Sequence, residues 1–115
     1  MLEDYFAIAA DPARADDDGV VTSRVRLSGE FDIDSREELR DALLEVITAG
    51  ECARLLVDLD QVRFIDSEAL SALIESYLAA ESAGIAFQLV GAHGIVKQVI
   101  TVAGLEHLFG GTGAP

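Results

Sequence analysis

Acidic and hydroxyl side chains gather at three positions where the sequence pattern changes from strand-like to helix-like. Gly29-Glu30-Phe31-Asp32 follows one strand-like segment, Asp66-Ser67-Glu68 opens an apolar periodic segment, and Gly91-Ala92-His93-Gly94 precedes another. In α/β folds, the surface that binds ligands and partners lies where strands end and helices begin. These three junctions are therefore the candidate functional positions of the chain.

Ser67 has the most informative chemistry at these junctions. A serine in the first turn of a helix, or the aspartate before it, ordinarily caps the helix, and composition alone favours that interpretation. A phosphate on the same hydroxyl would meet the positive end of the helix dipole, and we expect the backbone N–H groups of that turn to be free to receive it. Phosphorylation would add nearly two negative charges at an exposed turn and could reject a partner docked there.

The residue pattern does not predict a catalytic site or a metal site. A hydrolase triad could draw on Ser67 and His93, but Ser67 lacks the Gly-x-Ser-x-Gly turn of such enzymes. Cys52 is the only cysteine, so the chain has no disulfide framework and no thiolate cluster, and no His/Cys/Asp spacing matches a metal-ligand set. The glycines of 110–113 lack the lysine and the helix of a phosphate-binding loop. We expect no enzyme activity, no metal and no cofactor.

A phosphorylated receiver domain is an alternative with the same size and α/β order. Asp58 or Asp60 could serve as its phosphorylated aspartate after a middle strand. The first strand, however, ends without the acidic pair of receivers, and Lys97 falls inside a predicted helix rather than at the position of their late lysine.

The charge of the chain excludes several classes of partner. Its 115 residues include 21 acidic and 8 basic side chains, giving a net charge of −13, which repels nucleic acid and anionic lipid. Residues 1–60 carry −10 of this charge and residues 61–115 carry −3, which indicates either a solvated acidic face or a docking surface for a basic protein. The acidic N-terminal region does not resemble a signal peptide, and no apolar run approaches the ~18 residues of a membrane span. We expect a cytoplasmic protein without membrane insertion.

Apolar periodicity predicts four strands and three helices. Strands are expected at 6–10, 20–28, 54–59 and 85–90, the third covered on both faces. Helices are expected from 34 to 50, with Ser35 and Glu38 forming a capping box, from 66 to 83, and from 95 to 104. The side chains expected in the core are Val21, Val25 and Leu27 of the second strand, and Leu39, Ala42, Leu43, Val46, Ile47, Leu70, Leu73, Ile74, Tyr77, Leu78, Ile95, Val96, Val99 and Val102 of the helices; Thr22, Arg24 and Arg26 are expected to point outward.

This order of elements predicts a small α/β domain with a mixed sheet of about four strands and helices packed on it. The first two strands form an antiparallel hairpin, and right-handed crossovers leave the later strands parallel. Residues 1–115 are interpreted as a single domain with its core over about 5–109 and a flexible tail over 110–115.

The segment from Val57 to Ser67, VDLDQVRFIDS, resembles the signature of STAS domains, in particular that of bacterial anti-sigma factor antagonists. In that family an apolar strand leads to Asp-Ser-Ser/Thr-Gly-Leu at the start of the central helix. Leu27 to Asp32 is similar to the family's Gly-Glu-Leu-Asp turn, and residues 96–109 resemble its closing helix and Gly-Leu ending. The resemblance covers about residues 5–109.

The resemblance implies a binding switch without enzyme activity. The unphosphorylated antagonist binds an anti-sigma factor that is also a serine kinase and so frees a sigma factor; the kinase then phosphorylates the antagonist, and a serine phosphatase resets it. By this resemblance Ser67 is the phosphoacceptor, Asp66 is the acid before it, and Glu30 and Asp32 form an acidic turn near the docking face. We expect this face, with Glu68, to meet a basic surface of the partner.

The chain departs from the family pattern beside the acceptor. Glu68 stands in place of the second hydroxyl residue, Ala69 in place of the glycine, and Ser71 in place of a frequent second glycine. Glu68 suits the first turn of a helix, but its charge is expected to slow phosphorylation or to mimic it in part. The alternative function is a STAS interaction subunit of a transporter or stress-signalling complex that is never phosphorylated.

Overall fold

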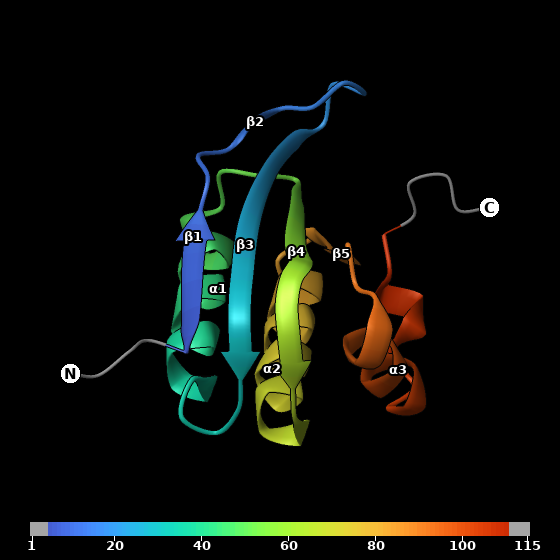
Figure 1. Ribbon diagram of the computed structural model, residues 1–115. Helices are drawn as coiled ribbons and strands as arrows, with labels where there is room; N and C mark the ends of the chain where they lie inside the picture. The colour runs from blue at the N-terminus through green and yellow to red at the C-terminus, as the bar shows by residue number, and fades with distance from the viewer. Residues whose placement is uncertain (1–4, 111–115) are drawn as a thin grey trace.

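The computed structural model describes residues 5–110, which form one mixed sheet and three helices (Figure 1). In chain order the elements are β1 (Phe6–Ala10), β2 (Arg14–Ala15), β3 (Val21–Phe31), α1 (Arg36–Ala49), β4 (Arg54–Ile65), α2 (Ser67–Ser82), β5 (Ala86–Val90), α3 (Gly94–Val102) and a 3₁₀ turn, η1 (Glu106–Leu108). The strand order is β1-β3-β4-β5, with the two-residue β2 paired to β3 beyond β1. Of the tail expected over 110–115, only Gly110 is described, and 111–115 lie outside the described residues.

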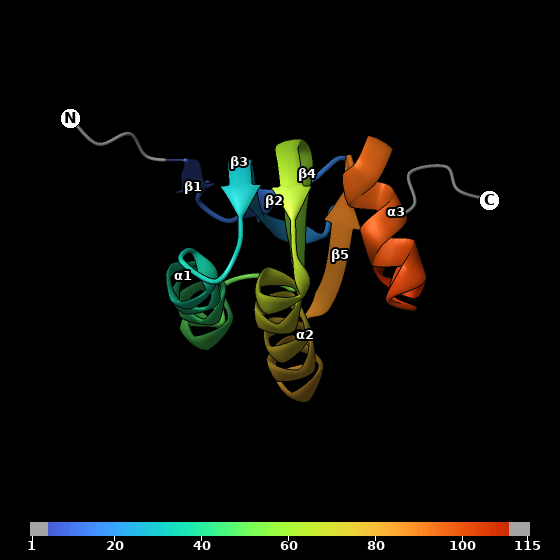
Figure 2. The ribbon, with the colours of Figure 1, turned by 60° about the horizontal axis from the view of Figure 1, so that its bottom comes forward.

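The predicted fold class is confirmed. β1 and β2 pair antiparallel with β3, and the β3–β4 and β4–β5 pairs are parallel, as the strand–helix–strand order predicts. The sequence pattern missed β2 because its two residues lie in a stretch rich in Pro, Asp and Gly. α1 and α2 cover one face of the sheet, and α3 lies beside β5 (Figure 2).

The core lies between this face and the two helices. Val25, Leu27 and Phe31 of β3 are buried there, as are Leu55, Val57 and Leu59 of β4. The stripe predicted for α1 is confirmed: Leu39, Leu43 and Ile47 are buried, and Ala42 and Val46 are half-buried at its margin.

The stripe predicted for α2 is wrong at one end, because small residues decide which side of this helix meets the sheet. Leu70 and Leu73 are buried as expected, Ile74 and Tyr77 are half-buried, and Leu78 is 53% exposed. The buried face continues instead through four small side chains, Ala69, Ala72, Ser76 and Ala80. Such residues let a helix backbone approach the sheet closely, and large apolar residues alone do not reveal them.

The predicted core also differs at α3 and β3. In α3, Ile95 and Val102 are exposed, and the helix packs through Val96 and Ile100. In β3, Val21 is 40% exposed at the end of the sheet. Thr22, expected to point outward, is buried because Arg54 Nε donates a 3.2 Å hydrogen bond to its hydroxyl and covers it.

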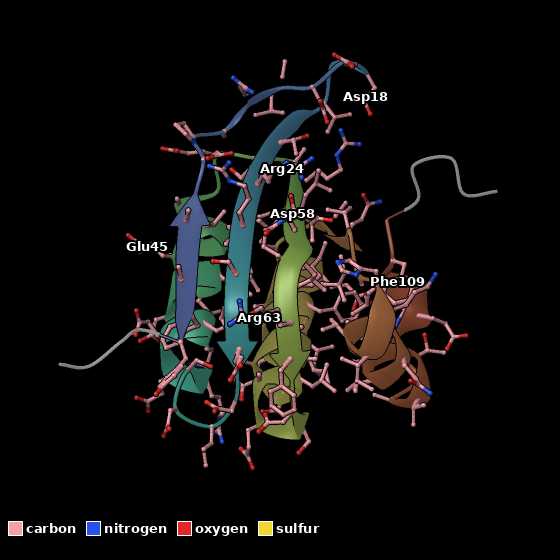
Figure 3. The ribbon with its side chains drawn as sticks, in the orientation of Figure 1. Asp18, Arg24, Glu45, Asp58, Arg63 and Phe109 are labelled. Carbon is pink, nitrogen blue, oxygen red and sulfur yellow. The ribbon has the colours of Figure 1, made fainter. Side chains whose placement is uncertain are left out.

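The strand over 54–59 is not covered by helices on both faces. Leu55, Val57 and Leu59 face α1 and α2, but Asp58 lies on the opposite face, where it accepts a 2.8 Å bond from Arg24 of β3 (Figure 3). The apolar run therefore belongs to a sheet with one polar, open face.

Arg54 anchors the loop that connects β2 to β3. Its guanidinium donates to both carboxylate oxygens of Asp18 at 2.9 and 3.0 Å, and to Asp16 at 3.2 Å. The hydrogen bonds from Arg54, followed by the one that Asp18 accepts from the backbone N–H of Val20, hold the pKa of the Asp18 carboxyl below its ordinary value of 3.8.

We predict that Arg54→Gln raises the pKa of Asp18 back toward 3.8, as followed by NMR titration of its carboxyl carbon. Because the folded-state pKa is the lower one, this pair stabilises the fold above the unfolded pKa, and the stabilisation is lost as pH falls through the folded pKa. Arg26→Gln, which removes the partner of Asp11 instead, is the control and should leave Asp18 unchanged. An Asp18 pKa that is the same in Arg54→Gln as in wild type would show that Arg54 does not lower it.

Two leucines of α2 provide a matched test of the packing. Leu73 is fully buried, so Leu73→Ala should lower the free energy of unfolding by about 2–5 kcal/mol in urea denaturation. Leu78 is 53% exposed, so Leu78→Ala should change it by less than about 0.5 kcal/mol. Equal losses would show that Leu78 is in the core, as the sequence pattern predicted.

Candidate functional site

The ends of β3 and β4 lie side by side and bring two of the three junctions together. Glu30 pairs with Phe64 and Phe31 with Ile65 in the parallel register. The backbone N–H of Asp66 then donates a 3.1 Å hydrogen bond to the carbonyl of Phe31. The loop that carries Asp32 and the first turn of α2 therefore lie together at the carboxyl ends of these two strands.

Asp66 is the N-cap of α2. Its backbone is extended, with φ −114° and ψ −176°, and its carboxylate oxygen Oδ1 accepts hydrogen bonds from the N–H groups of Glu68 and Ala69, both at 3.0 Å. The sequence predicts that the first-turn N–H groups are free for a phosphate, which is wrong for Glu68 and Ala69 because the Asp66 carboxylate already accepts from both. Ser67, whose side chain is exposed, is the first residue of the helix.

Asp32 lies in a tight turn organised by a buried serine. The Ser35 hydroxyl accepts a 2.9 Å bond from the Asp32 N–H and donates a 3.1 Å bond to the Asp32 carbonyl, while the Asp32 carboxylate accepts from the N–H of Asp34 at 3.0 Å. Ser35 is the N-cap residue of α1 but makes no side-chain capping bond. The capping box predicted with Glu38 is therefore wrong, because the Ser35 hydroxyl is used to close the turn.

Two of the candidate acidic residues form ion pairs. Arg36 at the start of α1 donates a 2.8 Å bond to Glu68, with about two-fifths of each side chain exposed. Glu30 lies 3.9 Å from the guanidinium of Arg63. These exposed pairs add little stability, but they offset part of the negative charge around Ser67.

Exposed apolar residues lie beside these acids, and the sequence pattern does not predict them. Ile33, next to Asp32, is 61% exposed, and Phe64, two residues before Asp66, is 44% exposed. A regular strand would place Phe64 on the same face as Val62, which is buried. The register shift between Gly29 and Glu30 leaves Arg63 as an extra residue in β4 and turns Phe64 outward, which apolar alternation alone cannot reveal.

The third junction, which contains His93, contacts β4 at Asp60, away from the other two. His93 Nε2 lies 2.9 Å from the carbonyl oxygen of Asp60, beside an open groove of about 320 Å³ that Ile95 also lines. The His93 ring thus has a backbone partner, and no bond to Ser67 occurs within residues 5–110. Over the same residues no group of three or more potential metal ligands comes together, and Cys52 is buried.

The described helices do not include one that is both long and apolar enough to cross a membrane.

Comparison with known proteins identifies the family. The sequence model of a family described as "Mlab, STAS domain" matches residues 15–110, and the chain therefore belongs to the STAS domain family. Its fold is that of the unphosphorylated anti-sigma factor antagonist SpoIIAA, with a TM-score of 0.76 and 19% identity over 90% of this chain and 86% of that one. This membership confirms the resemblance noted in the sequence and sets aside the receiver-domain alternative.

Two further solved structures have a similar fold. An anti-sigma factor antagonist from Mycobacterium paratuberculosis is 27% identical, with a TM-score of 0.70 over 90% of this chain and 83% of that one. A sulfate transporter family protein from Wolinella succinogenes is 18% identical, with a TM-score of 0.63 over 77% of this chain and 71% of that one. The fold is thus found both in anti-sigma factor antagonists and in a protein of a sulfate transporter family.

The capping role of Asp66 can be tested by substitution. Asp66→Ala removes the acceptor of two N–H groups and should lower the free energy of unfolding by about 1 kcal/mol, whereas Asp66→Asn, which keeps an acceptor oxygen, should retain most of it. Ser67→Ala is the neighbouring control and should stay within about 0.5 kcal/mol of wild type in the same urea titration. An Asp66→Ala variant as stable as wild type would show that its carboxylate does not cap α2.

Proposed function

We propose that the chain is an anti-sigma factor antagonist, a switch that binds a kinase-type anti-sigma factor and is released by phosphorylation of Ser67. The observation that carries this proposal is that Ser67 is exposed, at the first residue of α2 and directly after the capping Asp66. The 27% identity to the mycobacterial antagonist over 90% of the chain supports it. In this proposal the domain itself is not an enzyme and acts in the cytoplasm.

The docking surface in this proposal comprises Glu30, Asp32, Asp66 and Glu68, with the exposed Ile33 and Phe64 beside them. Apolar side chains surrounded by charged ones are typical of protein interfaces, in which the apolar part supplies contact area. The carboxylates would speed encounter with a basic partner and disfavour acidic ones. Glu30 and Glu68 already have arginine partners at 3.9 and 2.8 Å, so Asp32 and Asp66 carry more of the uncompensated charge.

The release step is a phosphoryl transfer. The Ser67 oxygen forms a bond to the γ-phosphorus of ATP held by the kinase, the bond from that phosphorus to ADP breaks, and the hydroxyl proton passes to a base of the kinase. The product carries nearly two added negative charges next to Asp66 and Glu68. Because Asp66 already satisfies two N–H groups of the first turn, the phosphate would compete with Glu68 for Arg36 and repel the docked partner.

The alternative, an interaction subunit that is never phosphorylated, also has a specific observation in its favour. At the site, Glu68 and its 2.8 Å pair with Arg36 stand where the antagonist pattern has a small hydroxyl residue. The similarity to a transporter family protein agrees with such a role. Both functions are binding functions, and they differ in whether Ser67 accepts phosphate.

The deciding experiment incubates the purified protein with candidate kinase-type anti-sigma factors and ATP, and locates phosphate by mass spectrometry. We expect one phosphate on wild type, none on Ser67→Ala, and a rate roughly fivefold higher for Glu68→Ser, equivalent to about 1 kcal/mol of barrier. Arg36→Gln should lower the rate, because it leaves the charge of Glu68 without its partner.

Ser71→Ala is the matched control, since Ser71 lies one turn further along α2 and its hydroxyl donates to the Glu68 carbonyl at 2.8 Å. It should be phosphorylated like wild type. Phosphate at another residue, or no phosphate with the cognate kinase, would refute the switch and favour the interaction subunit. Equal rates for wild type and Glu68→Ser would refute only the electrostatic argument.

A further inference from the structure

The two edges of the sheet differ in how they are covered. At the β5 edge, the chain after η1 returns alongside: Leu89 and Phe109 form a parallel bridge, and the N–H of Gly110 donates a 2.7 Å bond to the Leu89 carbonyl. At the other edge lies β1, which pairs with β3 on its inner side and has no strand on its outer side within the described residues.

The register shows which backbone groups of β1 face outward. Tyr5 accepts a 2.7 Å bond from the N–H of Glu30, and Asp11 donates a 2.8 Å bond to the carbonyl of Arg24. In an antiparallel pair, hydrogen-bonded residues alternate, so residues 5, 7, 9 and 11 point toward β3. The N–H and C=O groups of Phe6, Ile8 and Ala10 therefore point to the open edge, where they can pair with another strand.

An apolar groove runs beside these groups, between β1 and α1. Its volume is about 480 Å³, and its apolar lining includes Ile8, Ala10, Ala42 and Val46. Ile8 faces the helix side together with its buried partner Leu27, so a strand added to β1 would lay alternate side chains into this groove.

The rim of the groove is acidic. Asp11, Glu38, Glu45 and Glu51 line it, and no lysine or arginine does. Asp11 pairs with Arg26 at 2.9 Å, but Glu38, Glu45 and Glu51 have no ion pair in the part of the chain that the structure describes. Figure 3 shows Glu45 next to the outer side of β1. A second copy of this chain, with a net charge of −13, is a poor match for such a rim.

We propose that the β1 edge and the groove beside it bind an extended basic segment of a partner protein, added to the sheet as a further strand. Its backbone pairs with Phe6, Ile8 and Ala10. Of the alternate side chains that point into the groove, the apolar ones contact Ile8 and Val46, and the lysine or arginine ones meet Glu38 and Glu45. Strand addition of this kind draws affinity from main-chain hydrogen bonds and specificity from alternate side chains.

This surface is separate from the one around Ser67. Glu45 and Glu51 lie toward the C-terminal end of α1 and beyond it, whereas Arg36, which reaches Glu68, is the first residue of that helix. Glu38 is only two residues from Arg36, but this spacing turns the two side chains about 200° apart around the helix, so they project from opposite sides of α1. The proposal therefore goes beyond the switch, and occupancy of the groove is independent of the state of Ser67.

The test uses a fluorescein-labelled eight-residue peptide, followed by fluorescence anisotropy with the full chain. Every second residue of the peptide is valine or lysine in turn and the residues between are threonine, so that both valine and lysine can face the groove. Glu45→Lys should weaken binding about fivefold, whereas Glu106→Lys, an equal charge change beside the β5 edge, should weaken it less than twofold. On binding, the amide protons of Ile8 and Ala10 should exchange with solvent at least about tenfold more slowly by NMR. The amides of Ala7 and Ala9, which already pair with β3, serve as internal controls.

A peptide with N-methyl groups on the edge that would face β1 separates pairing from charge attraction. It should bind at least about tenfold more weakly than the parent peptide, because it cannot donate to the strand. Equal binding of the two peptides, unchanged exchange at Ile8 and Ala10, or equal effects of Glu45→Lys and Glu106→Lys would overturn the proposal. Concentration-dependent dimerisation abolished by Glu45→Lys would overturn it in favour of a second copy.

Discussion

The parallel pairing of β3 with β4 is the constraint on which the rest of the structure depends. Because the strands are parallel, their carboxyl ends lie next to each other. The hydrogen bond from the Asp66 N–H to the Phe31 carbonyl fixes where the chain leaves β4 and begins α2. The register shifts in this pair are equally consequential. They let Val62 and Ile65 both face the core while Phe64 turns to solvent, so an irregular ladder creates an apolar surface next to the helix start.

The sequence predicted the order of elements, the mixed sheet and the family, because these depend on long apolar periods and on the stretch from Val57 to Ser67. It also predicted the α1 core, where large side chains recur at helical spacing. It failed at Leu78 and Val21, because contacts distant in the sequence decide whether such residues are covered. The failure at Ser35 has another origin: a hydroxyl near a helix start can bond forward to the helix or back to the preceding turn, and spacing does not distinguish the two.

The acidic residues of the chain differ in whether they have a basic partner, which the net charge does not show. Around Ser67, arginines from α1 and β4 pair with two of the glutamates, whereas the outward side of α1 carries carboxylates without such partners. One helix therefore contributes a cation to the surface around Ser67 and anions to the groove beside β1. Two surfaces that bind different partners, as we propose, would need such a division of charge.

The small-residue face of α2 has a consequence for the proposed switch. With Ala69, Ala72, Ser76 and Ala80 against the sheet and Leu70 and Leu73 buried beside them, the helix backbone lies close to the sheet in a packed core that leaves it little room to shift. Its first turn would then stay in place with or without a phosphate. The partner would respond to the charge on a rigid surface and not to a conformational change of the domain. A kinase and a phosphatase would meet the same backbone, and the ratio of their activities would set the occupancy of the partner without any contribution from refolding of the domain.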